Sequence, residues 1–233
     1  MVIALILAGG TGTRLGGDIP KQYIEVNGKP IISYCLQTIM ECNEIDGVWI
    51  VASKEWQYDI KKLVDRYDEK NKFKGFSEPG SSRQMSIYNG LSDMSGVCGE
   101  ADYILIHDAA RPLLKERQIV ELCKVVQNHD GVLPVLPMKD TIYYSDNAIN
   151  VSKLLKRSCL YAGQAPEIFA YGKYLRANEL LKEKIQDING STEPAIMAGM
   201  DIVMVQGDEN NFKVTTLQDL RRFEQMMREE DSL

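Results

Sequence analysis

The stretch VIALILAGGTGTRLGGDIPK, residues 2–21, joins a short apolar run to a loop with five glycines and two cations, Arg14 and Lys21. Glycine lets a ligand approach the backbone amides closely, and successive amides form a concavity for anions. An ordinary turn would explain the glycines alone, but the arginine and the Pro-Lys pair favour a phosphate site. The loop matches neither common nucleotide motif, because it lacks the third glycine spacing of G-x-G-x-x-G and has no GK[ST].

Apolar runs typical of buried strands alternate with helical patterns along most of the chain. We predict strands at 2–8, 46–53, 72–76, 101–112, 131–138 and 201–207, and helices at 29–42, 54–67, 80–94, 115–130, 171–185 and within 210–227. This order predicts one α/β domain over residues 1–233, with a mostly parallel sheet and helices on both faces. Ligands in such sheets gather beyond the carboxyl ends of the strands. The glycine loop and the sequence HDAARP, residues 107–112, both follow predicted strands.

Residues 139–160 break this pattern. Alternating residues flank a polar turn at Ser145 to Asn147, which suggests a β-hairpin. A hairpin inserted into a parallel sheet has little room in the core. We therefore expect it to project as an arm and to pair with a second subunit, which makes the protein a homodimer.

The composition is that of a globular protein, with 44% hydrophobic residues and a net charge of −6. No apolar run approaches the roughly 20 residues needed to cross a bilayer, so we expect no membrane partner and a cytoplasmic location. The acidic balance argues against nucleic-acid binding. The five scattered cysteines form no C-x-x-C pair, so we expect neither a zinc site nor disulfides and assign the thiols to packing.

Two further motifs could carry chemistry. Arg83 and Ser86 stand at a predicted helix start that could hold an anion or a base edge, although a capped helix with a surface arginine explains them better when the motif is taken alone. Asp108 ends a predicted strand, where it could bind a divalent metal that bridges phosphates or could simply cap a turn. We interpret His107 as a satisfied core histidine and His129 as a cation at a helix end.

The end of the chain adds one more cation. Lys213 precedes the last predicted helix and could reach a phosphate or be solvated, and Thr216 with Asp219 is suited to capping that helix. A site of arginine, lysine, backbone amides and one aspartate is poor in acids, bases and nucleophiles. It suits phosphoryl or nucleotidyl transfer, where positioning and charge neutralisation do most of the catalysis.

Six motifs occur in one order: LAGGTGTRLG…PKQ, GSSRQMS, HDAARP, KDT, R-x-x-L-Y-x-G-Q-x-P and NFKVTT-x-x-DL. Together they resemble the cytidylyltransferases that act on sugar-alcohol phosphates. The resemblance implies a Rossmann-like domain that uses CTP and Mg²⁺ to form a CDP-polyol and pyrophosphate. Two acceptors remain open. LAGG and Y-x-G-Q-x-P favour D-ribitol 5-phosphate, whereas the methylerythritol enzyme, acting on 2-C-methyl-D-erythritol 4-phosphate, is the commoner type in bacteria.

The resemblance also implies roles for single residues. It implies that Arg14 and Lys21 neutralise the triphosphate and the transition state, and that Lys213 faces the α-phosphate or the incoming phosphate. From the arm, Thr141 and Arg157 would bind the polyol phosphate across the dimer interface. Mg²⁺ would lie near Asp108, and CTP would bind through Ala8, Gly9, Gly10, Gly12, Gly80, Arg83, Ser86, Asp108 and Ala109.

The chain departs from the family pattern at three places. Ala165-Pro166-Glu167 stands where the family has T-P-Q, residues 190–194 (GSTEP) replace an acidic T-D-[DE] segment, and Pro79 replaces a glycine. The first two bear on the acceptor more than on CTP.

Two rival functions also remain. A sugar-1-phosphate nucleotidyltransferase with another NTP should lack HDAARP and the Arg157 arm. A non-catalytic nucleotide-binding protein would not need the intact Arg14, Lys21, Asp108 and Lys213.

Overall fold

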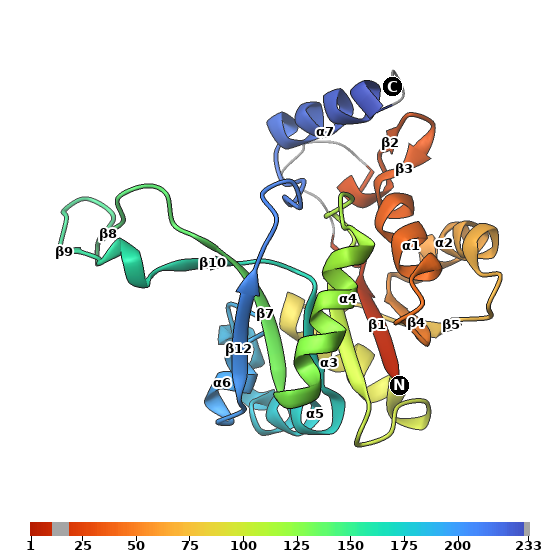
Figure 1. Ribbon diagram of the computed structural model, residues 1–233, viewed down its shortest axis with the longest axis horizontal. Coiled ribbons are helices and arrows are strands. Elements are labelled where there is room, and N and C mark those ends of the chain that lie inside the picture. The colour runs from red at the N-terminus through yellow and green to blue at the C-terminus, as the bar shows by residue number, and fades with distance from the viewer. Residues whose placement is uncertain (11–18, 231–233) are drawn as a thin grey trace.

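The protein is an α/β domain built on one large mixed sheet (Figure 1). The structure, a computed structural model, describes residues 1–10 and 19–230. Its strands are β1 (Val2–Leu7), β4 (Gly47–Val51), β5 (Phe73–Ser77), β6 (Tyr103–Asp108), β7 (Gly131–Pro137), β10 (Tyr161–Gly163), β11 (Glu167–Ala170) and β12 (Ile202–Gln206). They lie in the order β10-β7-β11-β6-β1-β4-β5, and β12 also pairs with β7.

The sheet is mostly parallel, as predicted. Parallel pairing joins β1 to β4 and β6, β4 to β5, and β7 to β12. The unexpected strand is β11, which pairs antiparallel with both β6 and β7. Because it is only four residues long and follows a loop, its sequence carries no clear period. It matters for the site, since its first residue lies beside the carboxyl end of β6.

Helices cover both faces of the sheet (Figure 1). On one face pack α1 (Ile31–Glu41), α2 (Lys54–Tyr67) and α4 (Glu116–Val125), and on the other pack α3 (Arg83–Asp93), α5 (Tyr171–Leu180) and α6 (Glu193–Met197). Strand β1 explains this arrangement: Ala4 and Ile6 belong to the first core, Ile3 and Leu5 to the second. Successive side chains of a strand point to opposite faces, so an unbroken apolar run is buried on both.

The last helix, α7 (Leu217–Glu230), packs with the small hairpin of β2 (Glu25–Val26) and β3 (Lys29–Pro30). The predicted cap is confirmed, because Thr216 N donates to Asp219 Oδ2 at 2.8 Å and Asp219 N donates to Thr216 Oγ1 at 3.2 Å. The helix expected at 171–185 is shorter, since α5 gives way to a 3₁₀ helix at Lys182–Asp187. The other 3₁₀ turns are Lys21–Tyr23, Met94–Gly96, Val126–Asn128 and Arg157–Cys159.

The predicted hairpin exists and projects from the body as an arm (Figure 1). Its antiparallel strands β8 (Tyr143–Tyr144) and β9 (Lys153–Leu154) are short, and the turn between them spans residues 145–152, longer than expected. The arm leaves apolar side chains in solvent: Ile149 is 85% exposed and Leu154 is 62% exposed. An unpaired two-stranded hairpin is marginal in water, so this arm is suited to a partner.

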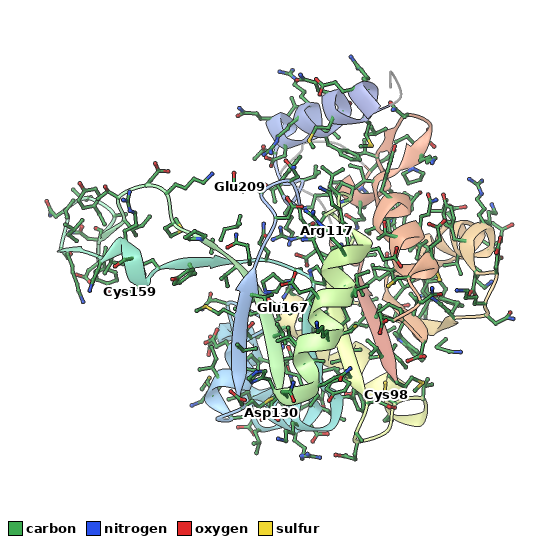
Figure 2. All side chains as sticks on the ribbon, viewed as in Figure 1. Cys98, Arg117, Asp130, Cys159, Glu167 and Glu209 are labelled. Carbon is green, nitrogen blue, oxygen red and sulfur yellow. The ribbon has the colours of Figure 1, made fainter. Side chains whose placement is uncertain are left out.

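The cysteine assignment needs one correction. Cys35, Cys42, Cys98 and Cys123 are buried, but Cys159 is exposed on the arm (Figure 2). The packing role predicted for Cys159 is therefore wrong within the chain, because the arm has no core of its own. Across residues 1–10 and 19–230, no helix combines the length and the apolar character that a membrane span requires.

Candidate active site

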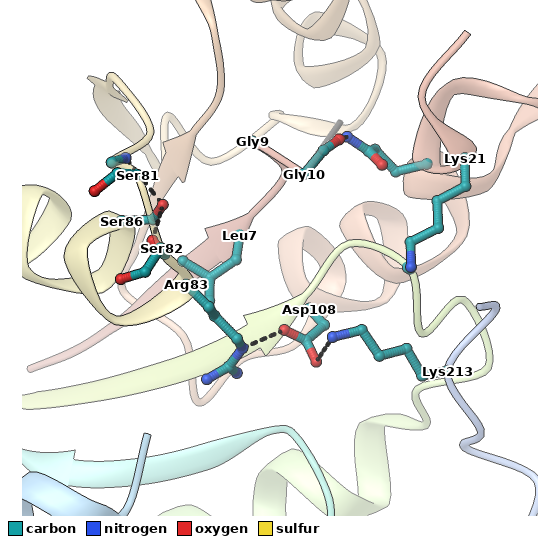
Figure 3. Close-up of a pocket in the computed structure, with 13 residues that line it drawn as sticks. Leu7, Gly9, Gly10, Lys21, Ser81, Ser82, Arg83, Ser86, Asp108 and Lys213 are labelled. Atoms are coloured by element: carbon teal, nitrogen blue, oxygen red, sulfur yellow. Dashed lines mark hydrogen bonds and ion pairs between the residues drawn. The ribbon is translucent and has the colours of Figure 1, made fainter. Parts of the chain in front are cut away.

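A cavity of about 300 Å³ opens beyond the carboxyl ends of β1 and β6 (Figure 3). These strands are parallel neighbours, with Leu7 opposite Asp108. The chain runs outward from β1 to β4 and β5 and then returns to β6 on the other side, so the strand order reverses here, where open α/β sheets bind ligands. We call it the glycine-loop cavity. Eight predicted site residues line it: Gly9, Gly10, Lys21, Gly80, Arg83, Ser86, Asp108 and Lys213.

Asp108 is the electrostatic centre of this cavity. Arg83 Nε donates to its Oδ1 at 3.0 Å, Lys213 Nζ lies 3.0 Å from its Oδ2, and Arg111 Nε lies 3.6 Å from Oδ2. Burial alone would raise the pKa of this carboxyl, but the Arg83 and Lys213 cations outweigh burial and hold the pKa well below its usual range. Asp108 is therefore ionised, and the surplus of cations around it suits a polyanionic ligand.

The base of the glycine loop is held by two side chains from the following 3₁₀ turn. Gln22 Nε2 donates to the carbonyls of Ala8 at 2.6 Å and Gly10 at 2.8 Å, and Tyr23 Oη donates to Ala8 O at 2.9 Å. Tyr23 in turn stacks on Trp56, with ring centroids 4.1 Å apart. Gln22 is 2% exposed, so these bonds form away from water and fix the carbonyls firmly.

The wall opposite Lys21 is the start of α3. Ser82 caps this helix by accepting from Met85 N at 3.1 Å, as the serines of GSSRQMS predicted. Ser86 Oγ accepts from Gly80 N at 3.0 Å and donates to Ser82 O at 2.9 Å. A Cβ on Gly80 would meet Met85 at 2.2 Å, so only glycine fits there. The helix is thus capped, and Arg83 is not a free surface arginine, because it lines the cavity and pairs with Asp108.

The structure gives less support to two of the predicted CTP-binding residues, Ala8 and Ala109. Ala8 N donates to Val51 O and Ala109 N donates to Leu7 O, so the sheet already uses these amides, and neither residue lines the cavity. His107 is a core residue, as interpreted: it is fully buried, its Nε2 lies 3.0 Å from Arg111 O, and burial lowers its pKa to about 4. It is only half satisfied, because its Nδ1 has no hydrogen-bond partner among the described residues. It holds the turn that follows Asp108.

Four further predicted residues are absent from this lining, two of them because the structure does not describe them. Gly12 and Arg14 lie outside the described residues. Thr141 and Arg157 belong to the arm, and Arg157 Nη1 donates to Lys139 O at 2.7 Å. Neither of them lines the glycine-loop cavity. His129, at the end of a helical turn as expected, has its Nδ1 2.7 Å from Asp201 Oδ2.

The side chains around Asp108 fit a magnesium ion that is bound mainly by the phosphates of a nucleotide better than a metal ion whose ligands all come from the protein. Nowhere in residues 1–10 and 19–230 do three or more acidic, histidine or cysteine side chains gather to hold a metal. Mg²⁺ commonly takes one or two carboxylates and completes its shell with substrate phosphates and water. Asp108 is ionised and lines the cavity, so it could supply that carboxylate by exchanging one of its cationic partners.

The sequence analysis gave no role to Gln22, and it marked Glu167 only as a departure that bears on the acceptor. Gln22 follows Lys21 directly in the quoted PKQ motif, so its place beside the predicted phosphate loop was the available signal. Glu167 is buried at the start of β11 and lies in a second cavity that shares Arg83, Asp108 and Lys213 with the first. Its position could not be read from the sequence, because β11 was not expected.

Among the described residues, cations and one ion-paired carboxylate line this cavity at the reversal point of a Rossmann-like sheet, an arrangement that fits the nucleotidyltransferase class. The comparisons narrow this class. Residues 2–229 match the model of the 2-C-methyl-D-erythritol 4-phosphate cytidylyltransferase family, and the chain belongs to that family.

The protein of the same name from Thermotoga neapolitana is 34% identical to this chain over 220 residues, which cover 94% of this chain and 94% of the relative. The one from Clostridium perfringens is 35% identical over 221 residues, which cover 94% of this chain and 95% of the relative. The fold is that of 4-diphosphocytidyl-2C-methyl-D-erythritol synthase from Anaerococcus prevotii, with a TM-score of 0.84, 22% identity and coverage of 97% of this chain and 96% of that one. These matches give no support to D-ribitol 5-phosphate as the acceptor.

Proposed function

We propose that this chain transfers the cytidylyl group of CTP to 2-C-methyl-D-erythritol 4-phosphate, giving 4-diphosphocytidyl-2-C-methyl-D-erythritol and pyrophosphate. The observation that carries the proposal is the convergence of Lys21, Arg83 and Lys213 on the cavity around Asp108 (Figure 3). The names of the family and of the relatives support the choice of nucleotide and acceptor.

The reaction needs positioning and charge neutralisation more than acid–base chemistry. A phosphate oxygen of the acceptor attacks the α-phosphorus of CTP, the bond from that phosphorus to the bridging oxygen breaks, and its electron pair leaves with pyrophosphate. Negative charge builds on the oxygens around the α-phosphorus, where fixed cations stabilise it most. We assign Lys21 and Arg14 to the triphosphate and Lys213 to the phosphate that attacks, because Lys213 stands between the two cavities.

We assign Mg²⁺ as the cofactor, held by Asp108 together with the phosphates. When bound, the ion would neutralise phosphate charge and shape the triphosphate. The chain's own part is to keep Asp108 ionised through Arg83 and Lys213. Removal of divalent cations with EDTA should abolish product formation, and added Mg²⁺ should restore it; full turnover in EDTA would exclude this assignment.

We further propose a homodimer in which the arms, residues 139–160, exchange between subunits. The exposed apolar side chains of the arm support this arrangement. Each arm would bring Thr141 and Arg157 to the acceptor side of its partner's cavity. Sedimentation of the protein as a monomer at micromolar concentration would rule out this arrangement.

The decisive assay offers the wild-type enzyme CTP, UTP, GTP or ATP with Mg²⁺ and either polyol phosphate, and measures pyrophosphate release. We expect turnover with CTP and 2-C-methyl-D-erythritol 4-phosphate, and kcat/KM at least tenfold lower with D-ribitol 5-phosphate. Absence of a CTP preference would favour a sugar-1-phosphate nucleotidyltransferase, and no turnover with any pair would favour a non-catalytic nucleotide-binding protein.

A further inference from the structure

Lys213 stands on irregular backbone. It belongs to the segment of residues 207–216 that joins β12 to α7, and its Nζ lies 3.0 Å from Asp108 Oδ2 (Figure 3). A segment outside helices and strands has no regular ladder of backbone hydrogen bonds, so its position depends on individual contacts. The lysine side chain is itself a flexible four-carbon stem. The ammonium group of Lys213 is therefore placed only as well as the backbone that carries it.

Gln164 holds this segment near its start by two hydrogen bonds to one residue. Gln164 Nε2 donates to Asp208 O at 3.1 Å, and Gln164 Oε1 accepts from Asp208 N at 3.0 Å. The side-chain amide thus pairs with the backbone as a residue of a neighbouring antiparallel strand would. Gln164 is only 7% exposed, so loss of the amide would leave two shielded backbone groups unpaired, which is costly. We call this pair of hydrogen bonds the Gln164 clamp.

Gly207 gives the Gln164 clamp the space that it needs. A Cβ on Gly207 would lie 2.3 Å from Gln164 Oε1 and 3.1 Å from Val135 O. Gly207 N also donates to Val135 O at 2.9 Å, so the backbone bond to β7 fixes Gly207 where the amide of Gln164 lies against it. The φ angle of Gly207 is not among the positive ones. Glycine is therefore required here by the close approach of the amide and not by the backbone conformation.

Asn211 extends the constraint to within two residues of Lys213. It is 1% exposed and donates through Nδ2 to Ala165 O at 2.8 Å. Arg111 Nη1 donates to the backbone carbonyl of Asn211 at 2.7 Å. Because Ala165 directly follows Gln164, two successive residues between β10 and β11 hold both ends of the turn that leads to Lys213.

The ion pairs of Asp208 contribute less to this placement than the clamp does. The Asp208 carboxylate lies 3.3 Å from Lys115 Nζ and 3.1 Å from Arg117 Nη2. These two cationic side chains are 47% and 73% exposed, and ion pairs in contact with solvent add little to stability. The shielded hydrogen bonds of Gln164 and Asn211 are therefore the contacts that fix the segment.

We propose that Gln164 is a positioning residue for the reaction: through the backbone of Asp208 it holds the segment that places the Lys213 ammonium group beside the attacking phosphate. This inference rests on the role of Lys213 in the proposed function. Both polar atoms of the Gln164 amide are engaged by Asp208, so Gln164 acts through Lys213 and not on the reacting atoms. A displacement of about 1 Å can cost about 10²-fold in rate, and the Asn211 contact limits the displacement when the clamp is lost.

The test is a double-mutant cycle between Gln164→Met, which removes both bonds of the clamp, and Lys213→Ala. We expect Gln164→Met to lower kcat/KM for 2-C-methyl-D-erythritol 4-phosphate about tenfold, with KM for CTP within twofold of wild type. In the Lys213→Ala enzyme the same substitution should change kcat/KM by less than about twofold, because the group that the clamp places is gone. Gln206→Met removes an exposed amide at the end of β12 and should match the wild type.

A second variant moves the clamp without removing any polar group. In Gly207→Ala the added Cβ would displace Gln164 Oε1. We expect kcat/KM for the acceptor to fall about tenfold again, and by less than about twofold when Lys213 is already alanine. This variant decides the question if the Gln164→Met protein does not fold.

The outcomes separate a positioning role from a structural one. Equal losses of kcat/KM with and without Lys213, or a lower Tm with wild-type kcat/KM, would show that Gln164 only stabilises the fold and would overturn the inference. Failure of both clamp variants to fold would overturn it as well. A Lys213→Ala enzyme with full turnover, or a wild-type enzyme without turnover on any substrate pair, would refute the proposed function, and the inference would fall with it. If the wild type prefers another nucleotide or acceptor, only the proposed substrates are wrong, and the same cycle measured with that pair decides the inference.

Discussion

The glycine-loop cavity and the second cavity, which Glu167 lines and which we call the Glu167 cavity, share Arg83, Asp108 and Lys213, yet their other walls come from different parts of the sequence. The first is walled by short contiguous motifs that follow β1 and precede α3. The second is walled mainly by two stretches that are far apart in sequence, residues 163–167 at the start of β11 and residues 189–192 before α6. A wall made by one motif is fixed by local backbone geometry, whereas a wall made by tertiary contact can change residue by residue. Nucleotide recognition is thus expected to resist variation, and acceptor recognition to tolerate it.

The largest effect should follow loss of the lysine at the end of the glycine loop. We expect Lys21→Ala to lower kcat/KM about 10³-fold, since removing one group that stabilises transition-state charge costs roughly 10²–10³ in rate. Pyrophosphate release under steady state measures it, with Lys124→Ala on the exposed face of α4 as the control. Retention of full turnover would remove Lys21 from the catalytic set and weaken the contrast between the cavities.

The arm offers the next largest effect, on the acceptor side only. Arg157→Ala should lower kcat/KM for the acceptor about 10²-fold with KM for CTP unchanged, since a bidentate contact to phosphate is lost. Mixing this variant with Lys21→Ala tests arm exchange: if subunits exchange freely, half the dimers are mixed and each has one intact site, so about a quarter of wild-type activity should return. No recovery after exchange would place Arg157 in its own subunit's site.

A smaller effect should distinguish the support of the glycine loop from its chemistry. Gln22→Met removes the donor to the Ala8 and Gly10 carbonyls. We expect KM for CTP to rise about thirtyfold while KM for the acceptor stays constant, because a net loss of about 1 kcal/mol for each of the two hydrogen bonds falls on the nucleotide side. Gln37→Met, which removes an exposed amide on α1, is the control. A parallel rise in both KM values would mean that Gln22 supports the cavities jointly.

The last prediction concerns His107, for which we expect the smallest effect on activity and a clear effect on the free energy of unfolding. Burial lowers the pKa of His107 to about 4, whereas an unfolded histidine titrates near 6.5. Between these values the unfolded chain binds more protons, so the contribution to stability is full above pH 6.5 and is lost as pH falls toward 4, a change of about 3 kcal/mol. Urea titrations at several pH values should show this slope, and His107→Gln should flatten it.

The sequence was sufficient for what depends on local patterns. Unbroken apolar runs identified β1, β4, β6 and β7, and the polar turn identified the arm, because burial on two faces and turn chemistry leave direct marks on residue order. Lys21, Arg83, Asp108 and Lys213 were predicted and do line one cavity.

Long-range placement left no such mark. Strand β11 is too short to show a period, and its position between β6 and β7 is decided by pairing with both. The contact of Ser191 with Glu167 joins residues 24 positions apart, so two departures that the sequence assigns only to the same side of the site are in direct contact in the structure. The exposure of Cys159 was missed for a similar reason, since a residue of a projecting arm has no core to enter.

That exposed thiol has a practical consequence. Burial raises the pKa of Cys35, Cys98 and Cys123 to about 12, and Cys42 is buried as well. Thiolates are the reactive species, so a maleimide dye added to the native protein should attach at Cys159 alone. The protein thus carries a natural attachment point on its arm, and energy transfer between dyes on separate molecules would report arm-to-arm approach without any engineered residue.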